Sequence, residues 1–328
     1  MMPAAPPRQW RVTSTPSPAA RLPDDLTVLE RGWLSSNNVI LHASASEAGA
    51  TLVDTSHVNH AQQTVALVRH ALSRRGGRLV RVVNTHLHSD HCGGNAAVQA
   101  AFDVPVWIPP GQADAVRAWD RASLSHEQTG QRCDRFTIDG VLEPGSVLAA
   151  GGRAWQVLAA PGHDPHAVML FDPRDGVLIS GDALWRDGFG VVFPETVGEP
   201  GFDDVGAVLD LIDTLPVRVV IPGHGAPFAD VADALARARS RLAAWRGDPA
   251  RHARHAAKVF IKYRLMEERE QPLAALCDWA SATPMMRGLW ERHAPPGAES
   301  PQAWAAQLVA DLARSGAVTV DGQTVRDA

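Results

Sequence analysis

A short stretch of the chain carries four side chains of the types that bind metal ions. His86, His88, Asp90 and His91 lie within six residues, directly after the apolar run of residues 79–83. Alternate residues of a strand point to the same side, so His86 and His88 can bind one ion where the chain leaves the sheet. The turn that follows carries Asp90 and His91 to a second position. The sequence therefore predicts a metal site, and a polar loop with scattered histidines is a far weaker interpretation.

Three further apolar strands are each followed by a glycine and a ligand-type side chain. They are residues 155–160 before Pro161-Gly162-His163, residues 177–180 before Gly181-Asp182, and residues 217–221 before Pro222-Gly223-His224. Open α/β sheets place their sites at the carboxyl ends of strands. A histidine after Pro-Gly is by itself more often a surface loop residue than a metal ligand. The evidence for a metal site therefore comes from the order of all three strings.

Taken together, these strings resemble the motifs of the metallo-β-lactamase superfamily, which run His-x-His-x-Asp-His, Pro-Gly-His, Gly-Asp and Pro-Gly-His-Gly. Thr51-Leu52-Val53-Asp54-Thr55 is similar to the first motif of that family, a strand that ends in an acid. The resemblance covers residues 26–224. It implies an α/β fold, a four-layer αββα sandwich in which helices cover two sheets packed face to face.

The resemblance also implies a dinuclear metal centre. It assigns His86, His88 and His163 to one ion, Asp90, His91 and His224 to the other, and Asp182 to a bridge between them. Asp90 and Asp182 are the expected catalytic residues, with a hydroxide that bridges the metals as the nucleophile. Two divalent ions are expected, Zn²⁺ first, with iron or manganese also compatible with these ligands. Asp54 either orients the ligand loop through hydrogen bonds or is a simple turn residue.

The expected activity is hydrolysis of a small ester, thioester or lactone, with glyoxalase II as the nearest mechanistic template. The sequence shows no cluster of basic residues beside the pocket that would mark glutathione binding. A nuclease or phosphodiesterase and an iron-dependent persulfide dioxygenase of the same superfamily stay open as alternatives. A β-lactamase is disfavoured for two reasons. The resemblance places Asp182 at the position where secreted zinc β-lactamases have cysteine, and no export signal is visible.

The composition is that of a globular protein with a large core. The chain has 328 residues, is 45% hydrophobic and carries a formal net charge of −5. Mild acidity gives no general attraction to nucleic acid. Cys92, Cys133 and Cys277 are odd in number and far apart, which argues against a disulfide framework. We expect a cytoplasmic protein that acts on a small-molecule acyl substrate and binds neither nucleic acid nor membrane; a homodimer stays open.

Three parts are expected along the chain: a disordered tail at 1–23, a metallo-β-lactamase-like catalytic domain at 24–229, and a mainly helical C-terminal domain at 230–328. Within the catalytic domain, helices are predicted near 61–74 and 112–121. Residues 185–195 should line the substrate pocket, with Trp33, Leu34 and Trp119 as weaker candidates for its wall.

The C-terminal part should be helical between residues 230 and 316. Asp248-Pro249 and Ser300-Pro301 are typical helix starts, and Asp321-Gly322 is typical of a hairpin turn. Helices followed by a hairpin resemble the winged-helix-like appendage of some superfamily members. The basic positions of the middle helix, Arg251, Arg254, Lys258 and Lys262, are expected to form a solvated face.

Overall fold

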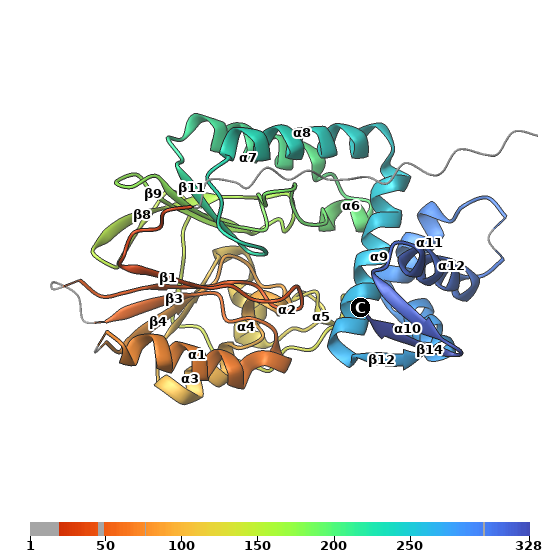
Figure 1. The fold of residues 1–328 in the computed structure, drawn as a ribbon, viewed down its shortest axis with the longest axis horizontal. Coiled ribbons are helices and arrows are strands. Elements are labelled where there is room, and N and C mark those ends of the chain that lie inside the picture. Colours follow the sequence, from red (N-terminus) through yellow and green to blue (C-terminus); the bar gives the residue numbers. More distant parts are fainter. Residues whose placement is uncertain (1–19, 45–48, 76, 298) are drawn as a thin grey trace, which may run out of the picture.

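The computed structural model describes residues 20–44, 49–75, 77–297 and 299–328. Most of the predicted tail, residues 1–19, lies outside them. Two sheets form the centre of the molecule (Figure 1). The first has the order β1-β2-β3-β4-β5-β6, with bounds Leu26–Leu29, Asn38–Leu41, Ala50–Val53, Leu79–Val83, Val106–Ile108 and Gly140–Val141. The second has the order β11-β10-β9-β8-β7, with bounds Val219–Pro222, Val177–Gly181, Val168–Asp172, Arg153–Ala159 and Val147–Ala150.

Helices cover the outer face of each sheet, which confirms the αββα sandwich. On the first sheet lie α1 (Ala61–Ser73), α3 (Asn95–Phe102) and α4 (Ala113–Ala118). On the second lie α7 (Phe202–Thr214) and α8 (Val231–Gly247). Five short helical segments lie in the connections: η1 (Val58–His60), α2 (Ser89–Cys92), η2 (Pro110–Gln112), α5 (His126–Thr129) and α6 (Phe193–Val197).

Strand alternation explains how the sheets bury both faces. In β9, Val168 and Leu170 pack between the sheets, whereas Met169 and Phe171 pack beneath the outer helices. Strand β4 divides its residues in the same way, with Val83 facing the second sheet and Val82 facing α1. Because successive side chains point to opposite faces, a strand buried on both sides must be apolar throughout.

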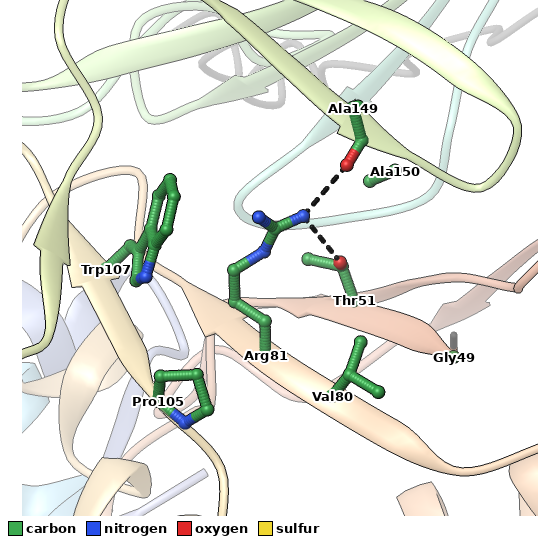
Figure 2. Close-up of a pocket in the computed structure, with 8 residues that line it drawn as sticks. All are labelled: Gly49, Thr51, Val80, Arg81, Pro105, Trp107, Ala149 and Ala150. Atoms are coloured by element: carbon green, nitrogen blue, oxygen red, sulfur yellow. Dashed lines mark hydrogen bonds between the residues drawn. The ribbon is translucent and has the colours of Figure 1, made fainter. Parts of the chain in front are cut away.

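One cation connects the two sheets away from the predicted metal site. Arg81 of β4 donates to Thr51 Oγ1 at 3.2 Å in the first sheet and to the carbonyl oxygen of Ala149 at 2.9 Å in the second (Figure 2). Its guanidinium lies 4.9 Å from the centre of the Trp107 ring. A small cavity of about 260 Å³ lies around it.

The C-terminal region has its own hydrophobic core. It consists of α9 (Pro249–Glu268), α10 (Leu273–Ala282), α11 (Pro284–His293) and α12 (Pro301–Arg314), with a small sheet of the order β12-β14-β13 (Glu270–Pro272, Thr324–Asp327 and Val318–Asp321). Both predicted helix starts are confirmed, since the Asp248 side chain accepts from Arg251 N and the Ser300 side chain accepts from Ala303 N. Gly322, at φ 59°, forms the predicted hairpin turn between β13 and β14.

Other predictions were incomplete. The helix expected at 112–121 is only α4, because the backbone turns left-handed at Trp119 (φ 55°) and ends it. Helices α3 and α7 were not among the predicted elements. Among the described residues, no helix is long and apolar enough to cross a membrane.

Candidate metal centre

All seven predicted ligands lie at one edge of the sandwich, where the loops after β4, β8, β10 and β11 converge. Strands β8, β10 and β11 run in the same direction, so their carboxyl ends lie at the same edge of the second sheet. Every one of the seven residues is buried. They form two neighbouring groups: His86, His88 and His163 in one, and Asp90, His91, Asp182 and His224 in the other.

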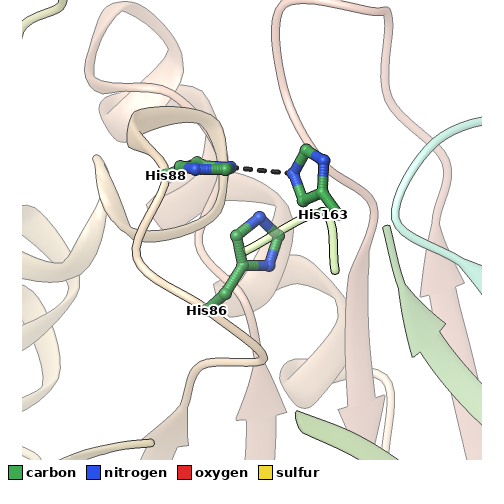
Figure 3. A group of neighbouring side chains, drawn as sticks. All are labelled: His86, His88 and His163. Atoms are coloured by element: carbon green, nitrogen blue, oxygen red, sulfur yellow. Dashed lines mark hydrogen bonds between the residues drawn. The ribbon is translucent and has the colours of Figure 1, made fainter. Parts of the chain in front are cut away.

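The first group consists of three histidines that point toward one another (Figure 3). His163 Nδ1 donates to the carbonyl oxygen of Val191 at 2.6 Å, which leaves the Nε2 lone pair facing His88 Nδ1 at 2.8 Å. His86 Nε2 is buried and has no hydrogen-bond partner within the described residues. Burial lowers the pKa of all three imidazoles, which favours the neutral form that can bind a metal ion.

The second group combines two carboxylates with two imidazoles. His224 Nε2 lies 3.0 Å from Asp90 Oδ2, and His91 Nε2 lies 3.4 Å from Asp182 Oδ1. Burial alone would raise the pKa of Asp90 and Asp182, but the nearby histidines lower both pKa values, so both carboxylates are ionised. Imidazole nitrogens and carboxylate oxygens at this spacing are ligands of divalent transition metals.

Asp182 is close to histidines of both groups. Its Oδ2 atom lies 3.5 Å from His163 Nε2 and 3.7 Å from His224 Nε2. A Cβ on Gly223 would overlap Asp182 Oδ1, so the Pro-Gly-His turn needs glycine there to let the two loops approach. Trp185 Nε1 donates to Asp182 Oδ1 at 3.1 Å and holds the carboxylate from the cavity side.

Asp54 lies behind the ligand loop and hydrogen-bonds to it. Its Oδ1 accepts from Thr85 N at 2.9 Å, and its Oδ2 accepts from Thr85 Oγ1 at 2.9 Å and from His91 Nδ1 at 2.8 Å. Because Nδ1 of His91 is occupied in this way, its Nε2 atom is the one that faces the site. The structure thus supports the orienting role for Asp54 over that of a simple turn residue.

The two groups fit a pair of divalent cations. Nε2 of His91, like that of His86, is buried without a hydrogen-bond partner among the described residues, although hydrogen bonding normally satisfies such atoms. Burial lowers the pKa of His91, but the carboxylates of Asp182, Asp54 and Asp90 raise it further than burial lowers it. The three carboxylates therefore make the electrostatic potential around His91 strongly negative, and a bound cation would neutralise it.

A cavity of about 920 Å³ opens onto the site. Trp33, 58% exposed, stacks on His224 with ring centres 5.4 Å apart, and several side chains of 185–195 line the wall as predicted. Leu34 and Trp119 do not line it; Trp119 packs against Phe136 instead. The expectation that no basic cluster adjoins the pocket was wrong, because the wall includes Arg186, Arg241, His255, Lys258 and Lys262.

Sequence reasoning missed two other polar residues of the site. Tyr263, on α9, donates from its hydroxyl to the carbonyl oxygen of Leu34 at 3.0 Å, and burial and then Asp90 raise its pKa. Asp164 is buried 3.7 Å from His88 Nε2, and burial raises its pKa. Asp164 directly follows the predicted ligand His163, so its position in the sequence could have indicated that it belongs to the site. Nothing in the sequence linked Tyr263 to the ligand residues some 170 positions earlier.

Comparisons with known proteins agree with this geometry. The chain is 31% identical over 175 residues to the hydroxyacylglutathione hydrolase of Synechococcus sp. (strain JA-3-3Ab), covering 52% of this chain and 58% of that protein. It is 28% identical over 161 residues to the acyl-coenzyme A thioesterase MBLAC2 of Gallus gallus, covering 45% of this chain and 57% of that protein. The chain thus spans less than two thirds of the length of these relatives.

Solved structures show the same fold over almost the whole chain. A beta-lactamase domain protein from Burkholderia ambifaria has a TM-score of 0.55 at 20% identity and covers 94% of each chain. A metallo-beta-lactamase family protein from Thermus thermophilus has a TM-score of 0.53 at 19% identity, covering 93% of this chain and 99% of that one. The model of the metallo-beta-lactamase superfamily matches residues 31–224, more than half of the chain. The chain therefore belongs to the metallo-beta-lactamase superfamily.

Proposed function

We propose that this protein is a dinuclear metal-dependent hydrolase of small thioesters. The observation that carries the proposal is the position of Asp182, whose carboxylate lies within 3.7 Å of histidine Nε2 atoms from both ligand groups. In the proposed arrangement, His86, His88 and His163 would hold one ion, Asp90, His91 and His224 would hold the other, and the Asp182 carboxylate would be shared between them. Zinc is the first candidate, since imidazole and carboxylate ligands suit it, and they also suit iron and manganese.

Two such ions would lower the pKa of a shared water molecule and polarise the thioester carbonyl. The side chains prepare the site for that reaction. Asp90 stays ionised and opens onto the cavity, so it can accept a hydrogen bond from the attacking water and orient it. Trp185 fixes the Asp182 carboxylate, and Asp54 fixes His91. The reaction consumes one water and releases a carboxylic acid and a thiol.

Two observations favour thioesters over other acyl substrates. The curated relatives are named hydroxyacylglutathione hydrolase and acyl-coenzyme A thioesterase, and both names describe the hydrolysis of a thioester. The cavity, about 920 Å³, has room for an acyl group together with part of its thiol carrier.

The basic helix α9 offers little support for the nuclease alternative. Arg254 and Lys258 both form ion pairs with Asp311 of α12, and Lys262 lies 2.5 Å from Asp327 of β14. These three side chains are directed to acids of the same chain instead of forming the expected solvated face. A phosphate backbone would have to displace those carboxylates.

Metal analysis followed by a substrate panel tests the proposal. We expect about two ions per chain at saturation, and hydrolysis of thioesters faster than that of lactones or phosphodiesters. Activity should be lost on chelation and restored by reloading. Full activity with one ion would contradict the dinuclear site. Faster phosphodiester cleavage, or oxygen consumption with a persulfide on the iron-loaded protein, would favour the alternatives.

A further inference from the structure

Another cluster of side chains of the types that bind metal lies beside the ligand loop. It consists of Cys92 at the end of α2, His126 at the start of α5, and Cys133 in the loop that follows α5. The ligand atoms that these three residues offer all lie within 4.8 Å of one another. Helices α2 and α5 are neighbours there (Figure 1), and Ser89 Oγ donates to Gln131 Oε1 at 2.8 Å between the two segments.

This cluster is separate from the cavity of the candidate metal centre. Of the described residues that line that cavity, none belongs to the cluster. Cys92 and Cys133 pack instead with the hydrophobic core beneath the helices of the first sheet. Cys92 is fully buried, whereas Cys133 is partly exposed, so an ion can reach the cluster from the side of Cys133.

The two sulfur atoms have the spacing of zinc ligands. Cys92 Sγ and Cys133 Sγ are 3.8 Å apart. Two thiolates that each lie about 2.3 Å from a zinc ion, on adjacent corners of a tetrahedron, are about 3.8 Å from each other. A disulfide bond requires a separation of about 2.0 Å. The pair therefore fits a shared ion without any change in its spacing, whereas a disulfide would need the two segments to move together.

His126 has a hydrogen-bond acceptor that no donor satisfies. Its Nε2 lies 3.3 Å from the carbonyl oxygen of Leu87, which can only accept, so Nε2 carries the proton and Nδ1 carries the lone pair. Nδ1 is buried and has no hydrogen-bond partner among the described residues. Burial lowers the pKa of the ring to about 4, so the ring is neutral at neutral pH. Core packing accounts for two buried thiols, but it does not account for this nitrogen.

We propose that Cys92, His126 and Cys133 form a third metal site, which binds a thiophilic divalent ion, Zn²⁺ foremost, through two thiolates and one imidazole. Binding releases the two thiol protons to solvent, and the two thiolate charges then balance the charge of the ion. Sulfur and imidazole nitrogen are ordinary ligands of zinc, and the fourth position is left to water. The imidazole nitrogen has to approach the sulfurs by at most about 1 Å to complete the site.

An ion at this position would hold the ligand loop from behind. Cys92 Sγ and His126 Nε2 both donate to the carbonyl oxygen of Leu87, which lies between the predicted ligands His86 and His88. The ion would thus connect α5 to the loop that carries four of the seven predicted ligands. With three protein ligands, one of which must first move, it should be bound more weakly than the ions of the dinuclear centre, and gel filtration should remove it.

Cobalt is the probe that separates this site from the dinuclear centre. Thiolate sulfur bound to Co²⁺ gives a charge-transfer absorption band in the near ultraviolet, and none of the seven predicted ligands of the dinuclear centre contains sulfur. The full chain, stripped of metal and kept reduced with a phosphine, is titrated with Co²⁺ until the spectrum is constant. We expect this band to appear and to saturate, and we expect excess Zn²⁺ to abolish it.

Cys133→Ser is the informative variant, because residue 133 is partly exposed and tolerates the change. Loss of a direct ligand should weaken Co²⁺ binding by at least the roughly 10- to 100-fold that follows from changing a partner behind a ligand. The band should therefore be absent at the Co²⁺ concentration that saturates the wild type. His126→Gln keeps both thiols and should weaken binding in the same way. Cys277→Ser is the matched control, a buried cysteine of α10 outside the cluster, and should leave the band unchanged.

Three results would overturn the site. They are the absence of the band in the reduced wild type, a band that persists unchanged in Cys133→Ser and His126→Gln, and a Cys92–Cys133 disulfide that withstands the reductant. The disulfide would leave Cys277 as the one titratable thiol of the unfolded chain, which has three cysteines. The band reports sulfur ligation and not turnover. A protein that shows it but hydrolyses no thioester would therefore retain this site and overturn the proposed function alone.

Discussion

Side chains behind the histidines decide which ring nitrogen faces the cavity. Asp54 holds Nδ1 of His91, and the Val191 carbonyl holds Nδ1 of His163, so both rings present Nε2. His88 differs, since Nδ1 is the atom that faces His163 while its Nε2 lies toward Asp164. The seven ligand-type residues could be predicted from motif spacing, but ring orientation depends on partners between 28 and 75 residues away in sequence and could not be predicted.

Asp182→Ala tests the proposed bridge. Loss of its carboxylate should reduce the metal content below two ions per chain and lower turnover by about 100-fold or more, since the reacting water loses its position. Elemental analysis and steady-state kinetics measure the two effects. Asp210→Ala, an exposed acid on α7, is the control and should keep both values. Near-normal turnover in Asp182→Ala would show that Asp182 is not the bridge.

Asp54→Asn tests the group behind the ligand loop. Removing its charge while keeping its shape should weaken affinity for the ion on His91 by about 10- to 100-fold, the usual effect of changing a partner that orients a ligand. Competition with a chromophoric chelator measures that affinity. If the metal affinity of the variant is unchanged, Asp54 does not orient His91 and is only a turn residue, with its own backbone left-handed at φ 58°.

Helix α9 joins the C-terminal region to the site through one buried histidine. The backbone N–H of Val192 donates to His252 Nε2 at 3.1 Å, so the ring must be neutral to accept it. Burial, followed by the charges of His255 and His293, lowers the pKa of His252 to about 3. Val192 lies in the wall segment after Asp182, so α9 fixes that segment as well as lining the cavity.

This contact predicts a loss of stability in acid. The unfolded chain protonates His252 near pH 6.5, whereas the folded chain does so only near its lowered pKa of about 3. Stability is therefore fully present above pH 6.5 and falls as the pH drops from there toward 3, by at most about 1.4 kcal/mol per pH unit from this group. Urea unfolding between pH 7 and 5 should show a shallower dependence in His252→Gln than in the wild type. His70→Gln, at an exposed position on α1, should match the wild type.

Secondary structure could be predicted where a local signal existed. Asp248 and Ser300 carry their own capping oxygens, so the starts of α9 and α12 were evident from sequence. The N-cap residue of α7, Gly201, has no side chain to signal the helix start, although Phe202, Val205, Leu209 and Ile212 have helical spacing that could have revealed the helix. The position of α9 against the metal centre could not be predicted, because it depends on packing between residues far apart in the chain.

The molecule as a whole is not expected to bind nucleic acid. Its net charge is −5, and Arg254, Lys258 and Lys262 of α9 are paired with Asp311 and Asp327. Fluorescence anisotropy with single-stranded RNA at low and moderate salt should show no submicromolar affinity. Tight, salt-sensitive binding that disappears on charge reversal at Arg251, Arg254, Lys258 and Lys262 would instead support the nuclease alternative.

The distribution of the ligand-type residues along the chain has a consequence for how metal ions would reach the proposed site. Four of the seven ligand-type residues lie within six positions, whereas His163, Asp182 and His224 follow strands β8, β10 and β11 and lie close to them only in the folded chain. The unfolded chain therefore already contains a local chelator, and metal bound there opposes folding and reduces the stabilisation that the ions give the native state. Refolding in excess zinc should be slower than refolding in chelator followed by metal addition, and refolding rates of equal value in the two conditions would contradict this.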